Sequence, residues 1–253
     1  DLPAMWLATG ASTYIGIGFV SGGVTYFGDE AVAAQTEVDL AAGTWDSRPL
    51  TGFDSGVMYY RRMTDVGNCS PIMTWLGGTS TAWTPLNGEQ KVYSLLADTY
   101  HATADGTERV NGNAQFALNA NLLALDGMGL KLVFSSHKSA AAESPEVRLR
   151  FGAAGSSADS LALGNWTMAT TTRNFAQTIA FKRASSTTLQ VQGAGTITAT
   201  GHRFGNSTTG ARLTALSGLN FTVANYLSMT VAKTTPFAEN MVTDVFDVWL
   251  TGR

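Results

Sequence analysis

The chain has 253 residues, of which 44% are hydrophobic and only 14% are charged, and its net charge at pH 7 is −3. No basic stretch stands out, which argues against nucleic-acid binding, and no apolar run is long enough to predict membrane insertion. The single cysteine, Cys69, excludes an intrachain disulfide. Abundant glycine with few charges favours strands and tight turns.

The first secondary-structure signals lie in the N-terminal half. Residues 14–20 and 24–27 flank a Ser-Gly-Gly turn, which predicts a β-hairpin, and residues 57–62 predict another strand. Apolar side chains recur at helical spacing in residues 88–98 and 113–124, which indicates two short helices, although strands would also fit both segments.

Three tryptophans of this half, Trp45, Trp75 and Trp83, lie in Gly-, Thr- and Pro-rich surroundings that predict long ordered loops. Flat indole rings in polar loops are suited to stacking on sugars, so glycan contact is one hypothesis for these residues. The alternative, which we favour, is that the rings fill the ends of a sandwich or the interfaces between subunits.

The second half shows the clearest signal, an alternation of apolar and polar side chains with a period of two. Val147, Leu149 and Phe151 share one face of a predicted strand, while Arg148 and Arg150 share the other. The same pattern predicts strands in residues 130–134, 188–192, 227–231 and 245–250. The predicted core set is Leu132, Phe134, Leu149, Phe151, Leu189, Val191, Met229, Val231, Phe246, Val248 and Leu250.

Short strands separated by Gly-rich turns predict an all-β fold, an antiparallel β-sandwich or jelly roll with long loops and at most short helices. We place a boundary near Gly127. Residues 1–127 would form an N-terminal β-rich region with long ordered loops, and residues 128–253 a jelly-roll sandwich. Strands and insertions of that same sandwich are the alternative for the N-terminal region.

Catalytic motifs are absent from the sequence, which has no GxSxG elbow, no HExxH motif and no P-loop. His101, His137 and His202 are isolated, which favours surface loops over a metal site. Asp244 and Asp247 are three residues apart in a predicted strand, so we expect them on opposite faces. We therefore expect no catalytic residues, no cofactor, no metal and no enzymatic activity.

A second group of carboxylates, Asp98, Asp105 and Glu108, clusters around an Asp-Gly pair. This pair predicts a turn, and we favour the turn over a pair of glycosidase carboxylates.

The second faces of two predicted strands carry small or neutral side chains. Ser228, Thr230 and Ala232 occupy this face in one strand, and Val245 and Trp249 in another. A solvent-facing strand would normally carry more charge, so these positions predict a surface that packs against further copies of the chain.

Residues 147–163, VRLRFGAAGSSADSLAL, resemble a recurring segment of structural proteins of tailed bacteriophages. In that segment an Arg-bearing strand leads into a small-residue turn, then an Asp and another strand. Residues 226–231 and 244–252 resemble the C-terminal strands of the same proteins, so the resemblance spans residues 128–253. It implies a fibre or head-decoration subunit, often threefold, without catalytic residues.

These observations together predict a non-enzymatic virion structural protein of a tailed bacteriophage, an oligomeric surface component such as a capsid decoration or fibre subunit. Its expected partners are two further copies in a homotrimer and other virion proteins such as capsid or tail subunits. We expect it on the surface of the extracellular particle. One alternative is a receptor-binding fibre or spike tip that recognises host-surface glycan. Another is a polysaccharide-degrading enzyme on a β scaffold.

Overall fold

The structure is a computed structural model. It describes residues 4–5, 17–21, 24–27, 30–32, 44–46, 60–75, 83–100, 106–138, 145–167, 174–194, 202–203, 215–232 and 241–252. Within these ranges the secondary structure is antiparallel strand apart from one short 3-10 turn, η1 (Leu86–Gly88). The predicted all-β fold class is confirmed.

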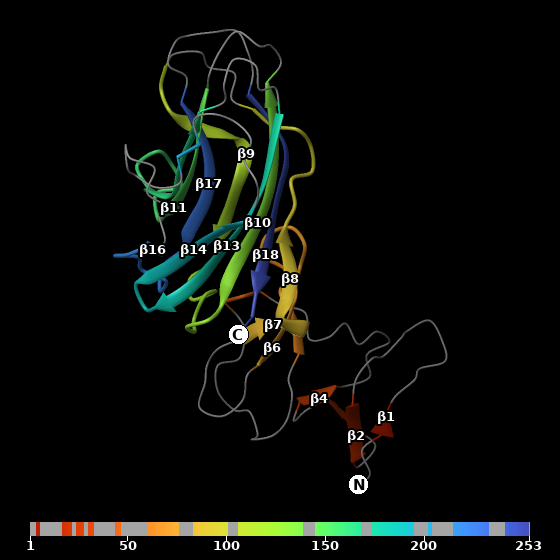
Figure 1. The fold of residues 1–253 in the computed structure, drawn as a ribbon. Coiled ribbons are helices and arrows are strands. Elements are labelled where there is room, and N and C mark those ends of the chain that lie inside the picture. Colours follow the sequence, from red (N-terminus) through yellow and green to blue (C-terminus); the bar gives the residue numbers. More distant parts are fainter. Residues whose placement is uncertain are drawn as a thin grey trace.

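Two antiparallel sheets form the main body (Figure 1). The six-stranded sheet has the order β16-β14-β13-β10-β18-β8, and the five-stranded sheet has the order β15-β12-β11-β17-β9. The strands are β8 (Glu89–Tyr93), β9 (Arg109–Leu118), β10 (Gly129–Lys138), β11 (Glu146–Gly152), β12 (Ser160–Thr167), β13 (Asn174–Ser185), β14 (Thr188–Ala194), β15 (His202–Arg203), β16 (Ala215–Leu216), β17 (Asn225–Ala232) and β18 (Met241–Thr251).

Eight of these strands follow the path of a jelly roll. The chain crosses from β8 in one sheet to β9 in the other, returns in β10, crosses again to the β11–β12 hairpin, and returns in β13. β17 then inserts between β9 and β11, and β18 inserts between β8 and β10. This double Greek key is the jelly-roll arrangement. β14 extends the six-stranded sheet as the hairpin partner of β13.

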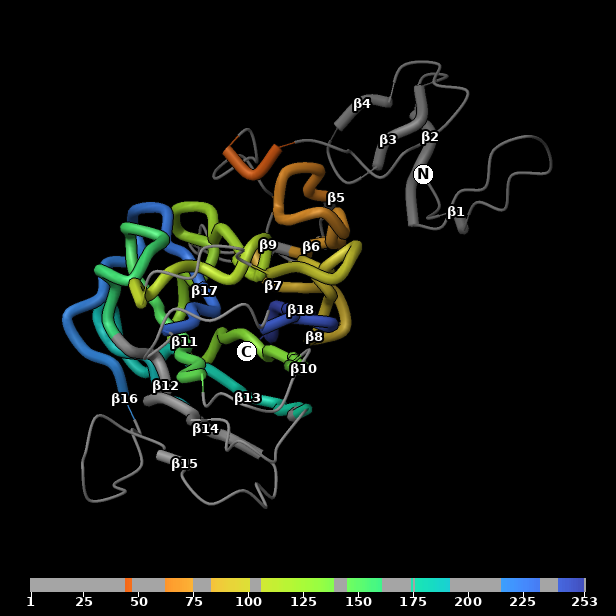
Figure 2. Tube along the Cα trace, turned by 90° about the horizontal axis from the view of Figure 1, so that it is seen from above, coloured from red at the N-terminus to blue at the C-terminus, as the bar shows by residue number. Residues whose placement is uncertain are grey.

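The core lies between the two sheets, which face each other when the molecule is seen from above (Figure 2). Along β11, Val147, Leu149 and Phe151 are fully buried, while Arg148 and Arg150 are half-buried on the other face. All eleven residues of the predicted core set are 0–3% exposed, so their predicted strand registers are confirmed. Burying each such side chain stabilises the fold by about 1.5–3 kcal/mol.

Two smaller sheets come from the N-terminal part of the chain. The first contains β1 (Ala4–Met5), β2 (Ile17–Ser21), β3 (Val24–Phe27) and β4 (Glu30–Val32), and the second contains β5 (Tyr60–Arg62), β6 (Ile72–Trp75) and β7 (Trp83–Pro85). The pairing of Ser21 with Val24 confirms the predicted hairpin between β2 and β3. β5 confirms a strand at the end of residues 57–62; residues 57–59 lie outside the described part of the chain.

The two short helices expected in the N-terminal half are wrong. Residues 89–93 form β8, and residues 113–118 belong to β9. Ala114, Phe116 and Leu118 are buried at every second position of β9, so their apolar spacing follows the period of a strand. Pairing with β18 and β17, which are distant in sequence, supplies the hydrogen bonds that a helix would make locally.

The predicted boundary near Gly127 does not separate the two sheets. β8 and β9 precede it, yet each forms the edge of one sandwich sheet. Part of the N-terminal region thus belongs to the jelly roll, in agreement with the alternative in which it contributes strands to the same sandwich.

Candidate functional site

The tryptophans proposed to contact glycan are buried wherever the structure describes their side chains. Trp45 is 1% exposed and Trp83 is 2% exposed. The Trp45 indole donates a hydrogen bond to the carbonyl of Ala120 (2.7 Å), and its backbone N–H donates to the Asp65 carboxylate (2.6 Å). Trp75 pairs with Trp83 in the β6–β7 register, and its side chain lies outside the described residues. Because the rings of Trp45 and Trp83 are covered by the protein, they present no free face to a sugar.

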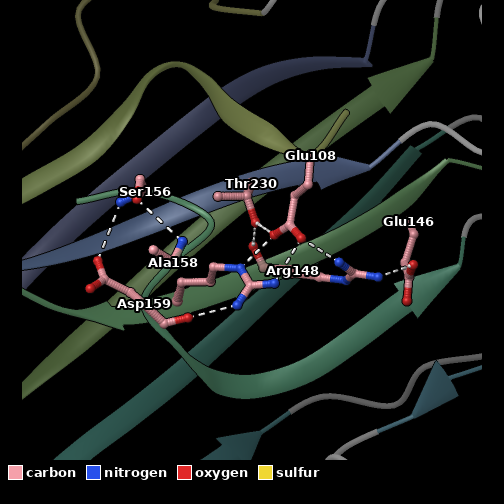
Figure 3. A network of polar contacts seen from close by, with 8 residues as sticks. Glu108, Glu146, Arg148, Ser156, Ala158, Asp159 and Thr230 are labelled. Atoms are coloured by element: carbon pink, nitrogen blue, oxygen red, sulfur yellow. Dashed lines mark hydrogen bonds and ion pairs between the residues drawn. The ribbon is translucent and has the colours of Figure 1, made fainter. Parts of the chain in front are cut away.

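The outer face of the five-stranded sheet carries an ion-pair network centred on Glu108 (Figure 3). The Glu108 carboxylate accepts hydrogen bonds from Arg148 Nη1, from Arg150 Nε (2.5 Å) and Nη2 (2.7 Å), and from Thr230 Oγ1 (2.5 Å). Arg148 also donates to Glu146 (2.5 Å). The network joins β11 and β17 to the segment just before β9, and the Glu108 side chain is only 12% exposed.

The electrostatics of this network favour the charged forms of Glu108 and Arg148. Burial alone would raise the pKa of Glu108, but hydrogen bonds from Arg150 and Thr230 and the charges of Arg148 and Arg150 outweigh it and lower the pKa from 4.5. Burial alone would lower the pKa of Arg148, but its bonds and charge pairing with Glu146 and Glu108 raise it. A glycosidase general acid needs a raised pKa, so the lowered pKa of Glu108 does not suit that role.

The turn after β11 explains the Arg–small-residue–Asp pattern in physical terms. The Asp159 carboxylate accepts backbone hydrogen bonds from Ala154 (2.8 Å), Gly155 (2.7 Å) and Ser156 (3.3 Å). Arg150 Nη1 donates to the main-chain carbonyl of Asp159 (2.6 Å). The turn between β11 and β12 is therefore fixed by the carboxylate of Asp159 and by the guanidinium of Arg150.

The expectation that Ser228 and Thr230 face another subunit is wrong. Both residues are 0% exposed within the single chain. Gln115 Nε2 donates to Ser228 Oγ (2.8 Å) and to the carbonyl of Gly155 (2.8 Å), and Glu108 accepts from Thr230. The chain's own polar side chains cover this face, since the Ser228 hydroxyl accepts a hydrogen bond from Gln115 and the Thr230 hydroxyl donates one to Glu108.

The outer face of the six-stranded sheet carries a tryptophan that two lysines contact. Trp249 lies between Lys91 and Lys131, whose ammonium groups are 4.6 and 4.8 Å from its ring centre. Lys91 pairs with Asp247 (2.7 Å) and Lys131 pairs with Glu89. These five side chains form a charge-balanced ladder across β8, β18 and β10.

Beside this ladder lies an uncharged surface, which we call the β10–β13 face. It consists of Val133, Ser135, Ala176, Thr178 and Ala180, all of them partly or fully exposed. The strand register places Val133 opposite Thr178 and Ser135 opposite Ala176. The adjacent strands β10 and β13 thus present five small or uncharged side chains next to one another.

The expectation that Asp244 and Asp247 lie on opposite faces of a strand is wrong. β18 has a register shift between Val245, the partner of Ser135, and Thr243, the partner of Ser136, so that Asp244 is the extra residue of a bulge. Asp244 pairs with His137 (2.6 Å) and Asp247 pairs with Lys91, both on the outer face of the sheet.

The described residues contain no group of three His, Cys, Asp or Glu side chains that could hold a metal ion. His202 lies in β15, and His101 is outside the described ranges. Within those same ranges, no helix has the length and hydropathy needed to cross a membrane.

Comparisons of the chain with protein-family models, with curated proteins and with solved structures found no match.

Proposed function

We propose that this protein is a non-enzymatic virion structural protein of a tailed bacteriophage, an oligomeric component of the particle surface such as a capsid decoration or fibre subunit. The observation that carries the proposal is the β10–β13 face, an uncharged outer sheet surface on a jelly roll. Jelly rolls recur in viral capsid proteins, and the segment from residue 147 to 163 resembles phage structural proteins.

The β10–β13 face is suited to packing against copies of the same chain. The solvent-facing side of an antiparallel sheet normally carries polar and charged side chains, whereas Val133, Ser135, Ala176, Thr178 and Ala180 carry no charge. Packing these five side chains would itself desolvate no ion, and the charged residues Lys131 and Asp247, the register partners of Ala180 and Val133, lie along the edge of the face. Closed cyclic symmetry is the usual outcome for identical subunits, and we propose a homotrimer because the resembled proteins tend to be threefold.

The test is the solution mass of the isolated chain by light scattering at micromolar concentration. We expect a mass three times the 26.7 kDa of the monomer, retained in high salt because area burial rather than ion pairing holds the subunits together. A monomeric mass would contradict self-assembly.

Two matched variants locate the interface. Ala180→Glu places a charge on the β10–β13 face, and Ala184→Glu places the same charge at an exposed position farther along β13. We expect Ala180→Glu to yield monomers and Ala184→Glu to remain trimeric. An unchanged mass for Ala180→Glu would exclude this face as the interface.

The position of the chain in the virion is tested separately by electron cryo-microscopy of intact particles. We expect density for the jelly roll on the outer surface of the head or tail. Its absence from purified particles would overturn the virion assignment even if the isolated chain is trimeric.

A further inference from the structure

A pocket of about 330 Å³ opens beside the two edge strands β8 and β9. One wall is the connection that leaves β8, and the other is the outer side of β9. The side chains that give the pocket its chemistry are Tyr93, Leu95, Leu96, Asp98, Asn113 and Gln115. Its volume is at the lower end of the roughly 300–1,000 Å³ of small-molecule sites.

The walls of the pocket are held in place by hydrogen bonds. Asn68 clamps Ser94, since its Oδ1 accepts from the Ser94 N–H (2.9 Å) and its Nδ2 donates to the Ser94 carbonyl (2.7 Å). Thr99 bonds through its backbone to Thr243 and accepts the Asn113 N–H at its hydroxyl (2.8 Å). Residues 94–99, which follow β8, are thereby fixed against β9, so this wall of the pocket is preformed and a ligand need not order it.

The lining combines an apolar surface with unused polar groups. Leu95 and Leu96 contribute aliphatic surface, and the Tyr93 ring is held by a hydrogen bond from its hydroxyl to the Asn113 carbonyl (2.8 Å). The Asp98 carboxylate and the Asn113 side-chain amide make no hydrogen bond to any residue in the described part of the chain. One of these groups only accepts hydrogen bonds, and the other both donates and accepts.

We propose that this pocket binds a neutral saccharide of one or two sugar rings. A sugar ring offers a C–H face for Tyr93 and Leu95 and adjacent hydroxyls, which donate to Asp98 and bond in both directions with Asn113. Asp98 is the only charged residue of the lining, so an acidic sugar would be repelled by its carboxylate. The inference goes beyond the proposed assembly role, and neither depends on the other.

Saturation-transfer NMR on the full 253-residue chain tests the proposal, with the methyl glycosides of glucose, galactose, mannose and N-acetylglucosamine as probes at millimolar concentration. We expect at least one probe to receive saturation from the protein. Asp98→Asn and Asn113→Ala should each weaken that probe's binding by about tenfold. Asp98→Asn exchanges one acceptor oxygen for an N–H donor and removes the charge, and Asn113→Ala removes the side-chain amide.

Asn174→Ala is the matched control, since Asn174 is an exposed asparagine on β13 outside the pocket lining. Its binding should equal that of the unmodified chain. Circular dichroism of all three variants verifies that each is folded. The proposal is overturned if none of the four glycosides binds, if the pocket variants bind as well as the control, or if methylammonium alone binds in an Asp98-dependent manner.

Discussion

Substitution of Glu108 by Gln is the sharpest probe of what holds the outer face of the five-stranded sheet together. The carboxylate accepts four hydrogen bonds, three of them from Arg148 and Arg150 and one from Thr230. Removing one partner of a buried ion pair costs about 3–5 kcal/mol. Arg148 keeps its second partner, Glu146, and both arginines retain some exposure, so we expect a loss of about 2–4 kcal/mol.

The assay is urea and thermal unfolding at neutral pH, followed by circular dichroism. For a chain of this size about 1 kcal/mol corresponds to roughly 2–4 °C, so Glu108→Gln should lower Tm by about 5–15 °C. Glu89→Gln is the control, because Glu89 is 41% exposed and pairs with Lys131 at the surface. The control should cost less than about 1 kcal/mol.

The pH dependence supplies an independent check. Because the folded-state pKa of Glu108 lies below its ordinary value of 4.5, its stabilisation is complete above that value and is lost as the pH falls through the lowered pKa. The stability difference between the unmodified chain and Glu108→Gln should therefore shrink in strong acid. Equal losses for Glu108→Gln and Glu89→Gln at neutral pH, or a difference that persists in strong acid, would refute the reasoning.

Three further substitutions test the packing and the turns. Leu149→Ala and Phe246→Ala should each lower the free energy of unfolding by about 2–5 kcal/mol in urea titrations, and thermal silence of both would contradict the core assignment. Asp159→Ala should cost about 1–3 kcal/mol and speed amide exchange in the turn after β11, where three N–H groups lose their acceptor. Gly112→Ala should destabilise by at least about 1 kcal/mol, since φ is +59° and a Cβ would lie 1.9 Å from Thr99 Oγ1; unchanged calorimetric stability would count against this backbone path.

The interior of the sandwich could be predicted from the sequence because burial of one strand face requires apolar residues at every second position. Leu149 and Phe151 alternate with Arg148 and Arg150, and this alternation over five consecutive residues indicates that the two apolar side chains are buried. The strands β8 and β9 are harder to predict, because the spacing of apolar residues around Val92 and Phe116 fits both a helix and a strand. What decides between them is pairing with β18 and β17, more than a hundred residues away along the chain.

The outer faces could not be predicted in the same way. The sequence around Glu108 predicts a turn, and nothing local indicates that its carboxylate contacts Arg148, forty residues later, and Thr230. Ser228 and Thr230 have the side chains of a partner-facing strand, yet the chain itself buries them. A single extra residue in β18 moves Asp244 to the face of Asp247, and such a bulge leaves no signal in composition.

The strand order also distinguishes residues that the fold itself requires from residues on surfaces that are available for binding. β17 and β18 are the last strands of the chain, yet each lies between two earlier strands, so neither sheet is complete until they are in place. Their alternating pattern is therefore imposed by the core, and the Asp159 turn is imposed by its backbone hydrogen bonds. A sequence resemblance confined to these segments therefore indicates a similar fold before it indicates a similar function. The β10–β13 face and the pocket beside β9 are constrained by neither requirement, which makes them the surfaces where substitutions can separate binding from folding.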